Sequence, residues 1–373
     1  MKLILSVVLV CSVFACKSNS ASAAGRAYVK PVKPSKGLTP SPTVSRGKPI
    51  VASKRGTRPE NLVDGKYKEG VWEGGLPNSA KPSWVSIDVG AGPQRLLLAW
   101  TASGSFNHNE TTYGGPGSYR IEVSADSTDG EDGAWKPVVT VTGNEYRTRA
   151  HGFDFTGDRW VRLAITGPSK TTYQYGVQLD EVDVHDISSG SEDTWFFLGD
   201  SITAKAFDRA PKHQPSFAEL IAKKHPGYFP MMLNGGIGFE KTTEGLARLP
   251  ALLKEHPEVH FWAIGYGTND AAGNGTETSG FEQNLAAMVK LIKDAGRVPV
   301  IARIPFAPHE HDGVPKFNAA IDGIAKKNGL TPGPDLYAHF KAHPEELEDG
   351  LHPNDAGIVS INRLWAEAVD SLY

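Results

Sequence analysis

The chain changes its pattern near residue 194, and this change constrains the fold more than any other feature. Beyond that point, short wholly apolar runs alternate with longer stretches in which apolar residues recur at helical spacing. Wholly apolar runs are typical of strands buried on both faces, and the longer stretches predict amphipathic helices. Their alternation predicts a doubly wound parallel sheet covered by helices. The expected strands span residues 195–199, 229–234, 259–265 and 298–305, and the expected helices span residues 215–225, 243–256, 281–296, 316–329 and 355–373.

Residues 47–186 follow a different pattern. Short runs of alternating apolar and polar residues are separated by turn residues, as in SWVSIDVG from Ser83 and YRIEVSAD from Tyr119. This alternation with frequent turns predicts a β-sandwich. Residues 187–193 are a predicted linker, and residues 194–373 are the second predicted domain. A chain of 373 residues is long enough for two domains with separate cores.

Residues 1–23 predict an export signal, because a basic start is followed by a short apolar run and then by small polar residues. Two interpretations of its processing stay open. The stretch VFAC is similar to the lipobox of bacterial lipoproteins, which predicts a lipid on Cys16 and attachment to a membrane, whereas ASAA predicts simple cleavage and secretion. Residues 24–46 are rich in Ser, Pro, Lys and Gly, which predicts a disordered tether. We therefore expect an exported protein.

Composition limits the expected partners. The chain carries 39 Lys and Arg against 42 Asp and Glu, for a net charge of −3. Without a basic excess, no nucleic acid is expected as a partner. Both cysteines, Cys11 and Cys16, lie in the export signal, so packing must stabilise the two domains without disulfides.

Residues that can carry chemistry follow three of the expected strands. Ser201 follows the first strand in a Gly-Asp-Ser turn, NGGIG from Asn234 follows the second, and GYGTND from Gly265 follows the third. A fourth motif, DGLHP from Asp349, precedes the last helix. In open parallel sheets, ligands bind beyond the carboxyl ends of the strands. We therefore expect the four motifs to share one site.

These residues suit nucleophilic catalysis. A serine hydroxyl is a poor nucleophile at neutral pH and needs a base, which a third group orients. His352 and Asp349 fit these roles for Ser201, because D-x-x-H on one turn lets the carboxylate reach one imidazole nitrogen and leaves the other for the hydroxyl. The N–H groups of Ser201 and Gly236 and the amide of Asn269 are expected oxyanion donors. Each of these residues taken alone can be explained as a helix cap or a turn former. Those explanations do not account for the convergence of all of them at one edge of the sheet.

The stretches FLGDSIT, LNGGIGFEKTTEG, GYGTNDA and DGLHPNDAG resemble, in order and spacing, the four sequence blocks of the SGNH hydrolases, also called GDSL-type esterases. The resemblance covers residues 194–373. It implies a flavodoxin-like three-layer α/β/α domain that needs no cofactor for catalysis. It also implies Ser201 as nucleophile, His352 as base and Asp349 as the partner of that base.

The same resemblance implies an oxyanion hole completed by Asn269 and by a glycine of the second block. Many members of the family have the donating glycine where this chain has Phe239. Gly236 is therefore one choice among several backbone N–H groups that can serve there.

Residues 47–186 resemble the discoidin-like, or coagulation-factor type C, modules of bacterial carbohydrate-active enzymes. The resemblance implies a structural calcium ion with Asp64 and Glu181 as contributors, although both also fit the description of ordinary surface acids. Aromatic residues exposed on loops would stack on sugars, and others would fill the core. The expected exposed residues are Trp72, Trp100, Tyr113 and Tyr173, and the expected core residues are Trp84, Trp135 and Trp160. This module could equally serve as a rigid spacer or form one wall of the active-site cleft.

Other polar motifs have simpler explanations. HPEVH (256–260) and PHEHDG (308–313) contain metal-ligand types, but solvated loops are the favoured interpretation. PHEHDG follows an expected strand, so it can also line the site without binding metal. Asp200 and Asp270 stand beside the expected catalytic residues and are interpreted as turn and hydrogen-bonding residues.

The sequence thus predicts an exported serine esterase that removes O-acetyl groups from a carbohydrate. One alternative is a short-chain lipase or thioesterase of the same family. The other is a surface protein with an inert hydrolase domain that binds carbohydrate through the sandwich.

Overall fold

The computed structural model describes residues 38–53, 58–66, 71–102, 114–170, 176–190, 192–208, 210–272, 278–308 and 313–373. The predicted export signal with Cys16, residues 24–37 of the predicted tether, Tyr113 and Tyr173 lie outside the described residues. The described residues belong to one compact unit. Within these ranges, no helix has both the length and the apolar content needed to cross a membrane.

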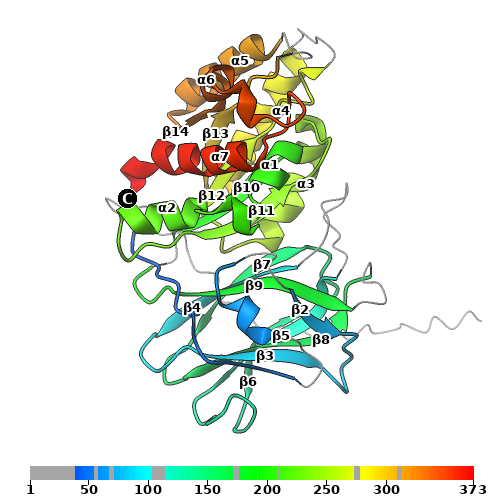
Figure 1. Ribbon diagram of the computed structural model, residues 1–373, viewed down its shortest axis with the longest axis vertical. Helices are drawn as coiled ribbons and strands as arrows, with labels where there is room; N and C mark the ends of the chain where they lie inside the picture. The colour runs from blue at the N-terminus through cyan, green and yellow to red at the C-terminus, as the bar shows by residue number, and fades with distance from the viewer. Residues whose placement is uncertain are drawn as a thin grey trace, which may run out of the picture. The chain divides into compact units, whose positions relative to one another are not determined.

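The first part of the chain forms two antiparallel sheets, as the alternating pattern predicts (Figure 1). One sheet has the strand order β1 (Ile50–Ala52), β3 (Ser83–Asp88), β8 (Trp160–Pro168), β5 (Pro116–Ser124) and β6 (Lys136–Val141). The other has the order β2 (Trp72–Gly75), β9 (Val177–Asp186), β4 (Arg95–Ala102) and β7 (Thr148–Asp154). Residues from both sheets form one apolar core, so the sheets pack as a sandwich.

Strand β4 is buried on both faces. Leu96 and Leu98 belong to the core between the two sheets, whereas Leu97 and Ala99 belong to a cluster that also contains Phe196 of the second domain. This explains why the strand has a continuous apolar run instead of strict alternation. The outer face of the smaller sheet is therefore covered by the second domain.

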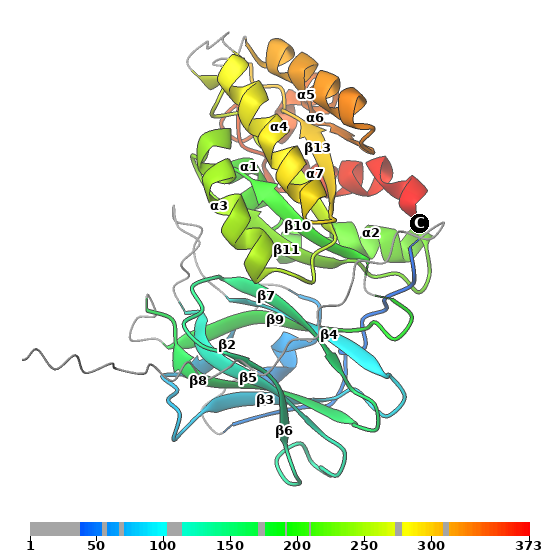
Figure 2. The same cartoon turned by 180° about the vertical axis from the view of Figure 1, so that it is seen from behind.

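The second part of the chain forms a parallel sheet between two layers of helices (Figure 2). Its strand order is β11 (Met231–Gly236), β10 (Thr194–Gly199), β12 (Phe261–Gly265), β13 (Val298–Arg303) and β14 (Pro332–Asp335). The helices α3 (Thr242–Glu255), α4 (Ser279–Asp294) and α5 (Val314–Asn328) cover one face. The helices α1 (Ser201–Ala206), α2 (Phe217–Lys224), α6 (Leu336–Ala342) and α7 (Asp355–Ala368) cover the other. Short 3₁₀ turns span Pro59–Leu62, Pro211–His213, Pro344–Glu346 and Asp370–Leu372. The three-layer α/β/α prediction is confirmed.

Residues 38–46, the end of the predicted tether, are ordered. Leu38 is buried in the apolar layer beneath α2 and α7, and its N–H donates to the carbonyl of Leu372 at 3.3 Å. The N–H of Val44 donates to the carbonyl of Val184 in β9 at 2.7 Å. The prediction of disorder is therefore wrong for these residues, because backbone pairing and one buried leucine compensate for the low apolar content of the segment.

Two of the tryptophans expected on the surface are in the sandwich core. Trp72 and Trp100 are 0% and 1% exposed and belong to the cluster between the two sheets. The prediction that they stack on sugars is wrong, because each lies on a strand with its side chain toward the opposite sheet.

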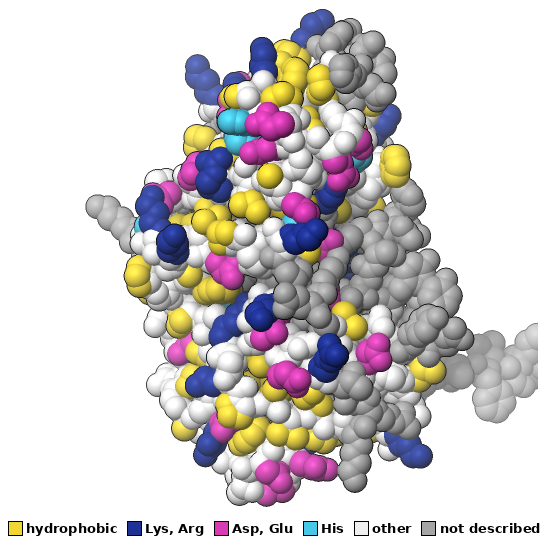
Figure 3. Space-filling view, in the orientation of Figure 1, with side chains coloured by type: hydrophobic (Ala, Val, Ile, Leu, Met, Phe, Trp, Pro, Cys, Tyr) yellow, Lys and Arg dark blue, Asp and Glu magenta, His cyan; other side chains and the backbone are white. Residues whose placement is uncertain are grey.

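The three tryptophans expected in the core differ in their burial. Trp160 is buried as predicted, whereas Trp84 and Trp135 are only half-buried. The guanidinium of Arg162 stacks on both rings, 4.4 Å from the centroid of Trp84 and 3.5 Å from that of Trp135. Elsewhere on the surface, basic and acidic side chains are interspersed over the face seen in Figure 3.

Candidate active site

Ser201 lies at the carboxyl edge of the parallel sheet. It is the first residue of α1 and comes one residue after β10, which pairs with β11 on one side and β12 on the other. The carboxylate of Asp200 accepts a hydrogen bond from the N–H of Ile202 at 2.9 Å and so caps this helix. Gly199 has no room for a side chain, because a Cβ there would overlap Thr203 Oγ1 and the carbonyl oxygen of Gly265.

The serine, histidine and aspartate predicted as a triad are in hydrogen-bond contact. Ser201 Oγ lies 2.9 Å from His352 Nε2, and His352 Nδ1 lies 2.7 Å from Asp349 Oδ2. The other carboxylate oxygen of Asp349 accepts from the backbone N–H groups of His352 and Leu351 at 2.7 and 3.0 Å. One aspartate therefore fixes both the backbone turn and the ring of the base.

Electrostatics keep Asp349 ionised. Partial burial favours its neutral form, but the hydrogen bonds from the backbone and ring of His352 and from the N–H of Leu351 outweigh that effect and lower its pKa to about 2. An ionised Asp349 holds the proton of His352 on Nδ1. The unprotonated Nε2 then faces the hydroxyl of Ser201, as a general base requires.

The triad is open to solvent. The side chain of Asp349 is 52% exposed and that of His352 is 28% exposed, and Ser201 is half-buried. A large alcohol portion of an ester can therefore extend outward from the serine.

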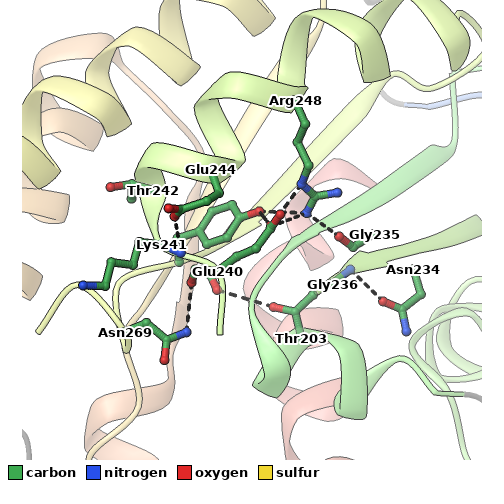
Figure 4. Close-up of polar contacts among 12 residues, drawn as sticks. Thr203, Asn234, Gly235, Gly236, Glu240, Lys241, Thr242, Glu244, Arg248 and Asn269 are labelled. Carbon is green, nitrogen blue, oxygen red and sulfur yellow. Dashed lines mark hydrogen bonds and ion pairs between the residues drawn. The ribbon is translucent and has the colours of Figure 1, made fainter. Parts of the chain in front are cut away.

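Asn269 follows β12 and meets the loop that follows β11 (Figure 4). Its side-chain amide donates to the backbone carbonyl of Glu240 at 2.9 Å. An amide has two hydrogens, so one fixes the side chain to this loop and the second is available to an oxyanion. The structure thus brings Asn269 to the sheet edge where Ser201 lies.

Gly236 is engaged in other contacts. Its N–H donates to Asn234 Oδ1 at 3.0 Å, and a Cβ on it would overlap the backbone nitrogen of Ala204. The next N–H, of Ile237, donates to the carbonyl of Gly199 at 2.9 Å. Gly236 is therefore explained by the close packing of β11 against α1, which does not favour its predicted role as an oxyanion donor.

A buried polar network holds the loop after β11 (Figure 4). Arg248 Nε donates to Glu240 Oε2 at 3.0 Å, and its Nη2 donates to the Tyr266 hydroxyl at 2.8 Å and to the carbonyl of Gly235 at 2.7 Å. The Tyr266 hydroxyl in turn donates to Glu240 Oε2 at 2.5 Å. The side chains of Glu240 and Arg248 are only 12% and 14% exposed. Glu240 is thus fixed by its side chain while its carbonyl positions Asn269.

The sandwich also reaches this loop. The guanidinium of Arg147, just before β7, donates to the carbonyl of Asn234 at 3.2 and 2.9 Å and to that of Gly236 at 3.1 Å. A planar guanidinium that bridges two alternate carbonyls at the end of one strand restricts both. Arg147, Arg248 and Glu240 were not found from sequence, because their partners lie far along the chain and no motif marks them.

The two other acids beside the site have structural roles, as predicted. Burial raises the pKa of Asp200 to about 7, and its hydrogen bond from Ile202 offsets only part of this. Asp270 accepts from the N–H of Thr242 at 3.1 Å and from its hydroxyl at 2.5 Å, at the start of α3.

Of the two expected calcium contributors, Glu181 pairs with a guanidinium and Asp64 accepts from a backbone N–H. Glu181 is buried and pairs with Arg46 at 2.5 Å, and Arg46 also pairs with Asp183 at 3.1 Å. Asp64 is exposed and accepts from the N–H of Lys66 at 2.7 Å. A guanidinium already neutralises the acidic pair, so this arrangement does not fit a calcium ion. Calcium stays a prediction for this module, and it would have to displace Arg46.

The first histidine motif, residues 256–260, differs from its expected state. His256 and His260 are 2% and 6% exposed, so they are not in a solvated loop. Burial lowers the pKa of His256 well below its usual value and that of His260 to about 4, which keeps both rings neutral. Among the described residues, no three His, Cys, Asp or Glu side chains form a metal-binding group. Residues 309–312 of the second motif lie outside the described residues.

The parallel sheet, the turn after β10 and the hydrogen-bonded Ser201–His352–Asp349 triad define a carboxylic ester hydrolase of the serine type. Residues 197–358 match the model of the GDSL-like Lipase/Acylhydrolase family. An arylesterase from Vibrio mimicus is 31% identical over 169 residues, which cover 44% of this chain and 82% of that protein. The chain belongs to the GDSL-like lipase/acylhydrolase family.

Two further similarities were found. The thioesterase 1/protease 1/lysophospholipase L1 of Escherichia coli strain K12 is 28% identical over 168 residues, which cover 44% of this chain and 78% of that protein. A chitosan-binding module from a chitosanase/glucanase of Paenibacillus sp. IK-5 is 22% identical and covers 38% of this chain and 97% of that module, with a TM-score of 0.29. The discoidin type of the sandwich stays a prediction.

Proposed function

We propose that the protein removes O-acetyl groups from a carbohydrate. The observation that carries the esterase chemistry is the continuous chain of contacts from Ser201 Oγ to His352 Nε2 and from His352 Nδ1 to Asp349, at 2.9 and 2.7 Å. The choice of a carbohydrate rests on the openness of this triad and on the sandwich joined to the hydrolase domain. A polymer chain cannot enter a closed tunnel, but its ester groups can reach an exposed serine.

The triad provides a two-step reaction. Ser201 Oγ attacks the acetyl carbonyl carbon while His352 Nε2 accepts the hydroxyl proton, and Asp349 stabilises the imidazolium. The tetrahedral intermediate collapses, and the sugar oxygen leaves with the proton from His352. Water, deprotonated by the same nitrogen, then attacks the acetyl-serine and releases acetate.

The oxyanion of each intermediate needs preorganised donors. We assign this role to the N–H of Ser201, to the second amide hydrogen of Asn269 and to a backbone N–H of Gly238 or Phe239. The last choice follows from the loop itself, because the N–H groups of Gly236 and Ile237 already donate to other acceptors.

Two other functions compete with this one. The names of the relatives include an arylesterase and a thioesterase, so an ester or thioester of another alcohol or thiol is the main alternative. A protein that only binds carbohydrate is the second. The aligned triad argues against it, because binding alone does not require a serine, histidine and aspartate in this geometry.

The test is acetate release from acetylated xylan, acetylated glucomannan and O-acetylated peptidoglycan, with 4-nitrophenyl esters of increasing chain length in parallel. The control is Ser201→Ala, which keeps the fold and removes the nucleophile. We expect release from at least one glycan, loss of that release in the control, and a preference for acetyl over longer acyl groups. Activity confined to long acyl esters or thioesters would favour the alternative, and no activity on any ester would contradict the esterase function.

We also propose, from the sequence pattern alone, that the protein is exported and held to a membrane by a lipid on Cys16. Labelling of cells with a radioactive fatty acid tests this point. We expect label on the wild-type protein and none on Cys16→Ser. An unlabelled wild-type protein in the medium would favour simple cleavage.

A further inference from the structure

Phe239 combines two unfavourable features. Its φ is 65°, and among the described residues only Arg58 is another non-glycine residue with positive φ. Bulky L-residues rarely adopt this region, because the Cβ crowds the following carbonyl oxygen. The side chain is also 75% exposed, and the only other exposed large apolar side chain in the described ranges is Leu76. Such a strained and exposed aromatic ring suggests a role outside the core.

The neighbours of Phe239 place it at the triad. The position of a Cβ on Gly238 would lie 4.0 Å from Ser201 Cβ. The carbonyl of Glu240 accepts the amide of Asn269 at 2.9 Å. Phe239 therefore lies between Gly238, which faces the nucleophile, and Glu240, which holds the expected oxyanion donor Asn269.

The surrounding contacts fix this conformation. Arg248 and Tyr266 hold the carboxylate of Glu240 on one side of Phe239, and Arg147 holds the carbonyl of Gly236 on the other. Strained residues persist where the structure around them is over-determined in this way. The backbone that carries Phe239 is thus held in place before any substrate arrives.

The chemistry of the site indicates what the ring contacts. The acetyl carbonyl must lie between Ser201 Oγ and the amide of Asn269, so the acyl group occupies the inner part of the site. The alcohol portion extends toward solvent, where the side chain of Asp349 is 52% exposed. The ring of Phe239, which is 75% exposed, likewise extends from the loop beside the nucleophile toward solvent.

We propose that the ring of Phe239 is a stacking surface for the sugar that carries the ester. The flat apolar faces of sugar rings pack on aromatic rings, and one exposed phenylalanine provides such a face. This inference rests on the proposed function, and it identifies the residue that selects a sugar ester over an ester of a small alcohol.

The test compares two substrates of different alcohol size. Acetylated xylo-oligosaccharides offer a sugar ring, whereas ethyl acetate offers only an ethyl group, and both are followed by acid release. The variants are Phe239→Gly, Phe239→Leu and Phe239→Tyr. The control is Leu76→Ala, which removes the other exposed large apolar side chain of the described residues, just after β2 in the sandwich.

We expect Phe239→Gly to lower the ratio of kcat/KM for the oligosaccharide to kcat/KM for ethyl acetate by about tenfold, mainly through KM. Phe239→Tyr should keep the wild-type ratio because the flat ring remains, and Phe239→Leu should resemble Phe239→Gly. Leu76→Ala should leave the ratio unchanged. The melting temperature of Phe239→Gly should be no lower than that of the wild type, because glycine adopts this φ without strain.

Three outcomes would count against the inference, and they are distinguishable. Wild-type activity on ethyl acetate without any on acetylated carbohydrates would contradict the proposed function itself. Wild-type activity on the oligosaccharide with an unchanged ratio in Phe239→Gly would overturn only the stacking role. A selective loss of activity on 4-nitrophenyl decanoate in Phe239→Gly and Phe239→Leu would overturn it in favour of contact with an acyl chain.

Discussion

At the scale of single residues, Asp349 holds His352 through both oxygens of one carboxylate. Oδ1 accepts the backbone N–H and Oδ2 lies 2.7 Å from Nδ1. Because Asp349 has a pKa of about 2, it is ionised throughout the range in which His352 acts as a base. Its carboxylate therefore determines which ring nitrogen carries the proton.

Asp349→Asn should keep the turn but favour the wrong tautomer of His352. We expect kcat for 4-nitrophenyl acetate to fall on the order of a thousandfold, with little change in KM, on the precedent of triads in other folds. Steady-state kinetics at pH 8 measures this. Asp355→Asn at the exposed start of α7 is the matched control, and a loss of less than threefold in Asp349→Asn would show that Asp349 does not orient the base.

The positions of the expected catalytic residues were predictable from sequence, because each follows a strand end or precedes a helix within a short motif. Ser201, His352 and Asp349 are in hydrogen-bond contact at the expected edge of the sheet, and Asn269 follows the neighbouring strand β12. The backbone oxyanion donor of the second block was not predictable from sequence. Its identity depends on which N–H groups of the folded loop already donate to other acceptors. That information lies in contacts such as the one between Gly236 and Asn234, which no local pattern encodes.

At the scale of elements, the loop between β11 and α3 depends on a buried ion pair. Arg248 on α3 fixes Glu240, whose carbonyl positions Asn269 after β12. Removing one member of a buried pair leaves the other charge uncompensated, at a cost of about 3–5 kcal/mol in stability.

Arg248→Met should therefore lower the melting temperature and also reduce kcat for ethyl acetate by roughly tenfold, because Asn269 loses its fixed position. The double variant Glu240→Gln/Arg248→Met removes both charges. We expect it to recover much of the stability while kcat stays low. Recovery of kcat together with stability would instead mean that the pair serves only folding.

Arg147 links the loop before β7 to the end of β11. Replacing it with methionine removes hydrogen bonds to the carbonyls of Asn234 and Gly236. We expect kcat for ethyl acetate to fall about threefold to tenfold, because only part of the energy of these charge-assisted hydrogen bonds serves to align the site. Arg159→Met, which removes an exposed pair with Asp88 on the sandwich, should leave kcat unchanged. Equal kcat in both variants would mean that the sandwich does not support the site.

Two of the strands that the sequence did not predict, β7 and β14, share one cause. Strand β7 has the sequence TRAHGFD, which shows no clear apolar alternation, yet Arg149 in it is buried and pairs with Glu255 of α3 at 3.2 Å. Strand β14 has the sequence PGPD and is defined by its pairing with β13. In both cases the stabilising partner lies on another element, whereas the strands and helices that were predicted carry their own apolar pattern.

At the scale of the whole molecule, one buried carboxylate, that of Asp193, joins the start of the hydrolase domain to Tyr373. Asp193, just before β10, accepts from the Tyr373 hydroxyl at 2.7 Å and from Trp195 Nε1 at 3.1 Å. Burial raises its pKa from 3.8 to about 7, although both hydrogen bonds act in the opposite direction. The native state therefore holds a proton that the unfolded state releases above about pH 4.

This proton makes stability fall as pH rises from about 4 to about 7. Asp193→Asn cannot ionise and keeps an oxygen acceptor for both donors. We expect it to match the wild type at pH 4 and to exceed its free energy of unfolding at pH 8 by on the order of 1–3 kcal/mol. Urea unfolding at the two pH values measures the difference. The same difference at both values would show that Asp193 is ionised in the native state.

The most direct test of the account is covalent labelling of Ser201 in competition with substrate. The protein is treated with an ethyl phosphonate ester that phosphonylates activated serines, and the modified peptide is identified by mass spectrometry. We predict a single adduct, on Ser201. Acetylated xylan should slow the formation of this adduct, whereas unacetylated xylan should not. An adduct on another residue, or none, would contradict the assigned nucleophile, and labelling that no acetylated glycan slows would contradict a carbohydrate ester as the substrate.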